Sequence, residues 1–165
     1  MADQQLSERL QPSLLDRLTD EEPGKSIDSR GNRVIDLDRL RQIVRRDIAW
    51  LLNTTNFAAS EDLDRYPNVA KSVLNFGIPD TAGRRIADLR DRSIEQVLKK
   101  AIQTFEPRIM PNTLKVSYSE GGGRDQTAVI AFDVRGQLWA QPVPLELFIR
   151  SEVDVTSGEV KIVDG

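Results

Sequence analysis

The sequence predicts an α+β fold in which an N-terminal arm and helices are followed by an antiparallel β-meander. Apolar residues recur at helical spacing up to Phe105 and at alternating spacing after Pro111. A run of helices followed by a run of short strands is typical of α+β proteins. We expect the 165 residues to divide into an arm, partly flexible, over residues 1–36 and a single domain over residues 37–165.

The composition argues against several classes of function. The chain has no cysteine and no histidine, so structural disulfides, thiol catalysis, serine–histidine hydrolysis and ordinary zinc sites are not expected. The net charge of −3 disfavours general nucleic-acid binding. We expect no signal peptide and no membrane insertion, because no apolar run approaches the ~20 residues of a membrane span.

The arm is polar except for a cluster of three leucines. Residues 12–18 are predicted to form a short amphipathic turn that contains Leu14, Leu15 and Leu18. Turn-rich sequence follows as far as Asn32. Two interpretations stay open: a disordered tail, or a segment whose leucines dock onto this domain or onto another protein.

Two long amphipathic helices are predicted. The first covers residues 37–52, and its apolar face consists of Leu37, Leu40, Ile43, Val44, Ile48, Leu51 and Leu52. Its other side contains Arg39, Arg41, Arg45 and Arg46. Trp50 lies off the main apolar face, and we expect it to widen the buried surface. The second helix is predicted to begin at Asp88 or Asp91 and to end at Phe105.

The segment between these helices is predicted to be a bent connector. Pro67 suits the first position of a helix, and Gly77 suits a left-handed helix stop. Pro79 prevents Ile78 from being helical. Apolar contacts are expected from Val69, Val73, Leu74 and Phe76.

Four strands are predicted after Pro111, over residues 113–119, 127–136, 144–155 and 159–163. The three glycines between the first two strands indicate a hairpin loop, because a phosphate-binding loop would open a helix and end in Gly-Lys-Ser/Thr. Pro142 and Pro144 indicate an edge or a strand start. We therefore expect an unpaired sheet edge between residues 144 and 163.

The tripeptide Glu106-Pro107-Arg108 ends the second helix. Pro107 disfavours helical geometry at Glu106, so the tripeptide is expected to be extended with both charges on one side. A carboxylate at a helix C-terminus is unfavourable by ~0.3–1 kcal/mol, which suggests a compensating partner. Two explanations stay open: an internal salt bridge, for example to an arginine of residues 39–46, or a paired-charge contact with another protein.

Four ordered segments of the chain resemble a known family. "PSLLDRLTD", "VRRDIAWLLNT", "YPNVAKSVLNFGIPD" and "AIQTFEPRI" are similar to TssE, the baseplate subunit of bacterial type VI secretion systems. That family is related to the lysozyme-like wedge protein of contractile phage baseplates. The resemblance covers essentially the whole chain and implies a lysozyme-like wedge fold.

The resemblance implies a structural subunit in the cytoplasm, in a baseplate docked at the inner-membrane complex. The partners that it implies are the wedge subunits TssF and TssG, with TssK and the sheath subunits TssB and TssC as further candidates. It also implies that the subunit helps contractile sheath polymerisation to begin, through main-chain pairing at an open sheet edge. No cofactor, metal ion or nucleic acid is expected.

The resemblance also implies which residues bind partners. The family's Glu-Pro-Arg motif falls on residues 106–108, which implies that this corner attaches the subunit to its neighbours. Further residues expected to contact partners, or to brace the corner, are Arg45, Arg46 and Asp47. Candidate docking residues of the arm are Leu14, Leu15 and Leu18.

Two alternative functions stay open. The lysozyme-like label invites glycoside hydrolysis, for which the nominal carboxylates are Glu106, Glu120, Glu146 and Glu152. Aromatic residues make up only 5% of the chain, which argues against a sugar cleft. Small proteins with a related fold act as regulatory anti-adaptors for proteolysis, but the intact Glu-Pro-Arg segment favours the baseplate family.

Overall fold

The computed structural model describes residues 13–19, 24, 37–83, 92–119, 129–139 and 144–163. Its α-helices are α2 (Leu14–Leu18), α3 (Leu37–Leu52), α4 (Pro67–Ala70) and α6 (Arg92–Phe105). Two short 3-10 helices are η2 (Phe57–Ala59) and η3 (Val73–Asn75). The strands are β1 (Lys115–Ser119), β2 (Val129–Leu138), β3 (Leu145–Asp154) and β4 (Val160–Val163).

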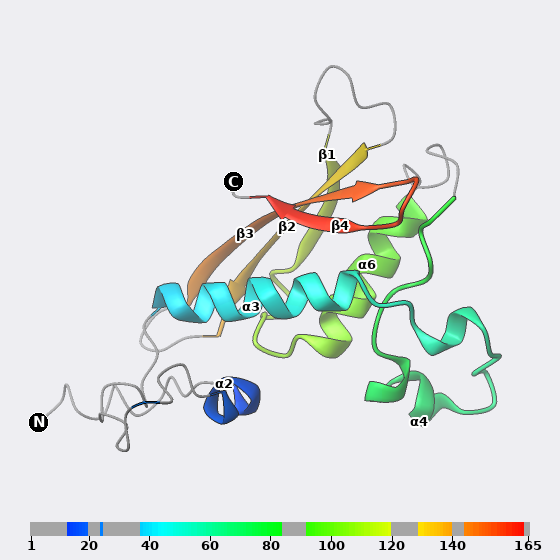
Figure 1. Ribbon diagram of the computed structural model, residues 1–165, viewed down its shortest axis with the longest axis horizontal. Coiled ribbons are helices and arrows are strands. Elements are labelled where there is room, and N and C mark those ends of the chain that lie inside the picture. The colour runs from blue at the N-terminus through cyan, green and yellow to red at the C-terminus, as the bar shows by residue number, and fades with distance from the viewer. Residues whose placement is uncertain are drawn as a thin grey trace, which may run out of the picture.

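The strands form one antiparallel sheet in the order β1-β2-β3-β4. Helices α3 and α6 pack on one face of this sheet (Figure 1). Helix α2 lies below α3 in the same view, while the sheet lies above it, and η2, α4 and η3 form a lobe beyond the C-terminal end of α3. Helices before a β-meander confirm the predicted α+β fold.

The core lies between the two long helices and one face of the sheet. Burial alternates along β3, as expected for a strand with one covered face. In β2, residues 130–134 are buried without alternation, including Ala131 and Asp133. The cross-strand pairs of β2 and β3 on the covered face are Ile130 with Val153, Phe132 with Ser151, and Val134 with Ile149. The predicted apolar face of α3 is buried except for Leu37, which is exposed at the first position of the helix.

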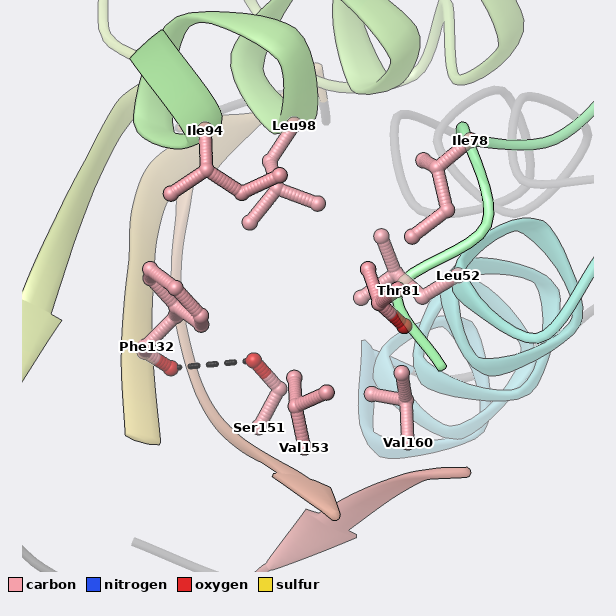
Figure 2. A pocket seen from close by; sticks show the side chains of 9 residues that line it. All are labelled: Leu52, Ile78, Thr81, Ile94, Leu98, Phe132, Ser151, Val153 and Val160. Atoms are coloured by element: carbon pink, nitrogen blue, oxygen red, sulfur yellow. Dashed lines mark hydrogen bonds between the residues drawn. The ribbon is translucent and has the colours of Figure 1, made fainter. Parts of the chain in front are cut away.

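The core leaves one small cavity, of about 10 Å³. Figure 2 shows that side chains of α6, of the sheet and of the 78–81 segment point into it. The hydroxyl of Ser151 donates a hydrogen bond of 3.1 Å to the carbonyl oxygen of Phe132 there. A cavity of this size holds one water molecule at most, so it offers no ligand site.

The connector between α3 and α6 differs from the prediction. Pro67 begins α4 as expected, but Val73 and Leu74 are 81% and 70% exposed and do not contribute to the core. Phe76 alone of the predicted set packs against the buried cluster, edge-to-face with Phe105 at 5.3 Å between ring centroids. The exposure has a local cause: η3 is a three-residue turn that lies in the lobe and away from the sheet.

One asparagine holds the lobe together. The side-chain oxygen of Asn75 accepts a hydrogen bond from the N–H of Ala58 at 2.8 Å, and its amide nitrogen donates to the carbonyl oxygen of Ala70 at 2.9 Å. Because these two groups belong to η2 and α4, a single side chain at the end of η3 links all three short helices.

Gly77 brings this segment against the end of α3. The N–H of Ile78 donates to the carbonyl oxygen of Thr54 at 2.8 Å, and the carbonyl oxygen of Ile78 accepts from the N–H of Asn56 at 2.9 Å. Gly77 has a φ of +120°, and a Cβ there would lie 2.2 Å from the carbonyl oxygen of Thr54. The glycine therefore permits a close backbone approach, rather than only stopping a helix as predicted.

The sheet edges are β1 and β4, so the edge predicted between residues 144 and 163 is β4 and not β3. β3 lies between β2 and β4, and Pro144 comes directly before its first residue, which is the strand-start position allowed to proline. Pro142 and the predicted glycine loop lie outside the described residues.

Each edge strand is bonded to a side chain from a helix or from the residue directly after one. At β4, the Asn53 amide donates to the carbonyl oxygen of Val160 and accepts from its N–H, both at 2.8 Å. At β1, the N–H of Tyr118 donates to the Glu95 carboxylate at 2.7 Å. These bonds satisfy main-chain groups that would otherwise be free to pair with another strand.

Candidate functional site

The Glu106-Pro107-Arg108 corner is closed on itself. The Arg108 guanidinium donates to both carboxylate oxygens of Glu106, at 2.6 Å from Nε to Oε1, and the Arg108 N–H donates to Oε1 at 3.1 Å. The Glu106 side chain is only 4% exposed. The charges are thus on one side, as expected after the proline, but Glu106 does not project into solvent. Its cation is Arg108, two residues away, and not an arginine of α3.

The residues after the corner are bound to the end of β2. Ile109 forms an antiparallel bridge with Leu138. The N–H of Trp139 donates to the carbonyl oxygen of Arg108 at 2.7 Å, and the N–H of Met110 donates to that of Gln137 at 2.8 Å. Main-chain bonds therefore fix the corner to the sheet immediately after α6 ends.

A chain of alternating charges links this corner to α3 and to α2. The Arg108 guanidinium also donates to Asp47 at 2.6 Å, and Asp47 accepts from Arg46 at 2.8 Å. Arg46 in turn donates to Asp16 of α2 at 2.5 and 3.2 Å. We call Asp16, Arg46, Asp47, Glu106 and Arg108 the ion network.

Contacts within the ion network shift the pKa values of Arg108, Asp16 and Arg46. Burial disfavours the charge of Arg108, but hydrogen bonds and charge attraction from Glu106 and Asp47 outweigh it, so the pKa of Arg108 is raised. The hydrogen bond from Arg46 lowers the pKa of Asp16 despite partial burial. The bond with Asp16 likewise raises the pKa of Arg46.

The ion network lines a half-open cavity of about 330 Å³, which we call the corner cavity. Its apolar wall comes from α3, from the end of α6 and from the connector, and α2 closes part of it. The lining residues are Ser13, Leu15, Arg46, Asp47, Ile48, Trp50, Leu51, Phe76, Phe105, Glu106 and Arg108. A cavity of this volume lies within the range of protein binding sites.

The structure brings most of the predicted site residues to this one place. Residues from all three predicted groups, the arm, α3 and the corner, line the corner cavity. Leu15 lines it, but Leu14 and Leu18 point their side chains largely into solvent. Arg45 is partly buried on α3 and is absent from the cavity lining.

Sequence reasoning missed the aromatic part of the site. Trp50 was expected to widen the buried face of α3, yet it is half-exposed, and the Arg46 guanidinium lies 4.9 Å from its ring centroid. Phe76 was expected to make apolar contacts, without any indication that it faces a cavity. The only available signal was the position of Trp50 four residues after Arg46, which places both side chains on one helix face.

The sequence profile described as "Baseplate wedge protein gp25" matches residues 38–143. This span contains α3, the Glu-Pro-Arg corner and the first two strands. The chain belongs to the baseplate wedge protein gp25 family. TssE subunits belong to the same family. A structural role in a contractile baseplate therefore applies to this gp25-family chain.

No curated protein and no solved structure shows a significant match to the gp25-family chain. Among the described residues, none of the helices is both long enough and apolar enough to cross a bilayer. Within the same ranges, no group of three or more acidic side chains is placed to hold a metal ion.

Acid should release α2 from the gp25-family chain. Since the folded pKa of Asp16 is below its unfolded value, docking is stabilised above about pH 4 and is lost as the pH falls through the folded pKa. Fluorescence of Trp50, in a Trp139→Phe background, should report the release, because Arg46 contacts both Asp16 and the Trp50 ring. Asp16→Asn should remove this transition, while circular dichroism follows the fold. A signal that stays flat under acidification until the fold itself is lost would contradict the expectation.

Proposed function

We propose that this chain is a structural wedge subunit of a type VI secretion baseplate, and that it attaches to TssF and TssG at the corner cavity. The observation that supports the proposal is the ion network, which joins the Glu-Pro-Arg corner to the arginine-rich helix around one partly exposed cavity. The localisation that follows is cytoplasmic, in a baseplate docked at the inner-membrane complex.

The charged groups of the corner cavity suit a protein partner. Arg46, Asp47 and Arg108 are each about a quarter to a third exposed, so a partner's side chains can reach them. Their positions are already held by two or more hydrogen bonds within the subunit. A rigid set of charges loses little conformational entropy on binding, which favours a specific interface.

Sheath initiation is the finer part of the proposal. A sheet edge can accept a strand from the sheath subunits TssB or TssC through main-chain hydrogen bonds. At β4 such a strand would have to displace the Asn53 side chain from Val160. TssK stays a further candidate partner, and the division of the chain at residue 36 stays a prediction.

We also propose that the subunit has no glycosidase activity. Both carboxylate oxygens of Glu106 accept hydrogen bonds from Arg108, and the side chain is buried, so neither oxygen faces a surface that a sugar could reach. Glu146 is exposed on β3, and Glu120 lies outside the described residues. A peptidoglycan clearance assay with the purified subunit should give no activity, and measurable clearance would contradict this part of the proposal.

Co-purification with TssF and TssG tests the attachment. The variant Glu106→Gln/Arg108→Met replaces both charges of the buried pair together, so it should stay folded and lose capture. Arg41→Met is the matched control, because it removes an arginine of α3 whose ion pair with Asp38 is solvent-exposed. Circular dichroism on each protein shows that the fold is kept.

The possible outcomes test the proposed partners and the proposed attachment point separately. Capture by the wild type and by Arg41→Met, but not by the double variant, would support attachment at the corner cavity. Equal capture by all three would place the attachment elsewhere. No capture by a folded wild type would contradict TssF and TssG as partners.

A further inference from the structure

Helix α2 is already a ligand of the corner cavity. Ser13 caps it, and the Asp16 carboxylate reaches Arg46 of α3 with two hydrogen bonds. The Asp16 side chain is 8% exposed and that of Arg46 is 32% exposed, so the contact is partly buried. Leu15 lines the cavity beside it. The molecule thus shows what this surface binds: a short helix with an adjacent leucine and aspartate.

The fit of α2 is incomplete. Leu14, Leu15 and Leu18 are 71%, 46% and 75% exposed, so most of its apolar surface is not covered. About 330 Å³ of the cavity is left open beside it, against the rings of Trp50, Phe76 and Phe105. A helix of five residues has little stability of its own and depends on such contacts.

The contact between Arg46 and Asp16 favours an occupant with a carboxylate at this position. Besides the hydrogen bond from Arg46, the positive charge of Arg39 acts favourably on the Asp16 carboxylate. Both arginines belong to α3, four turns of a rigid helix packed on the core. Arg46 therefore keeps its place in the cavity wall whether or not α2 occupies the cavity, whereas Asp47 and Glu106 of the same wall are paired with Arg108.

We propose that the corner cavity binds an amphipathic helix of a wedge partner, with a carboxylate for Arg46 and bulky apolar side chains for Trp50, Phe76 and Phe105, and that α2 occupies this site until the partner displaces it. The proposal rests on the proposed function, and it adds the chemistry of the partner and the fate of the arm. Binding of an apolar helix face into a groove is a common recognition mode. A longer helix would cover the rings that α2 leaves open.

Displacement has a measurable consequence. A site that is blocked most of the time binds its partner more weakly. Its apparent dissociation constant is the intrinsic one divided by the fraction of molecules in which the site is open. Removing the Asp16 carboxylate should open the site without changing the walls that α3, α6 and the connector supply. If α2 instead formed part of the binding surface, the same substitution would weaken partner binding. The sign of the effect separates the two arrangements.

The first probe is a labelled synthetic peptide, LQPSLLDRLTD, which copies residues 10–20. The full-length Asp16→Ala variant should bind this peptide at least about tenfold more tightly than the wild type does, because its own α2 no longer competes. Asp38→Ala is the matched control, since Asp38 also pairs with an arginine of α3 but is solvent-exposed. A peptide with asparagine in place of the aspartate that copies Asp16 should bind poorly.

The second probe is the TssF–TssG pair. Asp16→Ala should capture it at least about threefold more tightly than the wild type does, and the unlabelled peptide should compete. Weaker capture by Asp16→Ala than by the wild type would overturn displacement, and so would failure of the peptide to bind the variant. Peptide binding without capture of TssF–TssG by any form would support the helix site while contradicting the proposed partners.

Discussion

Arg108→Met should lower the free energy of unfolding by about 3–5 kcal/mol, because it leaves the buried carboxylate of Glu106 without a cation. Arg108 makes three hydrogen bonds to Glu106, one from its main chain and two from its guanidinium. Among the residues that the structure describes, no other one donates a hydrogen bond to that carboxylate. Urea denaturation followed by circular dichroism at neutral pH measures the loss.

The control for this prediction removes both charges. Glu106→Gln/Arg108→Met should be clearly more stable than Arg108→Met alone, since a neutral amide replaces the unpaired carboxylate and still accepts from the main-chain N–H of residue 108. Asp47 keeps Arg46 as its partner in both variants. Equal stability of the single and double variants would show that the ion pair does not dominate the stability of the corner.

Gly77→Ala should destabilise the domain by about 2–6 kcal/mol, which is the sum of backbone strain and of overpacking against a carbonyl group. At a φ of +120°, the new Cβ would lie 2.2 Å from the carbonyl oxygen and 2.8 Å from the carbonyl carbon of Thr54. A backbone shift that relieved this clash would separate Thr54 from Ile78. It would also break the hydrogen bonds that join the end of α3 to the connector. Thermal and urea unfolding measure the effect.

Gly83→Ala is the matched control for that substitution. Gly83 also has a positive φ, of +69°, but a Cβ there meets nothing within 4 Å. Gly83→Ala should lower the free energy of unfolding by only about 1–2 kcal/mol, which is the strain of a left-handed residue without a clash. If the two substitutions cost the same, the contact with Thr54 would not be the reason that glycine is needed at position 77.

The sequence by itself determined the fold class and the order of the elements. Helical periodicity placed α3 at its observed bounds and ended α6 at Phe105, before a proline that cannot continue a helix. Alternation predicted all four strands, each within a few residues of its observed ends. These features depend on which side chains are apolar and on local backbone restrictions, so neighbouring residues suffice to predict them.

Only the tertiary structure decided the candidate site. Charge alone suggested an arginine of α3 as the partner of Glu106, whereas α3 supplies a carboxylate, Asp47, and the arginine is Arg108. The exposure of Val73 and Leu74, and the interior place of β3, were likewise not predicted. Which charges meet, and which apolar residues stay in solvent, depends on how α3, α6 and the sheet pack together. That packing joins residues such as Asp47 and Arg108 that lie far apart in the chain, and no local pattern encodes it.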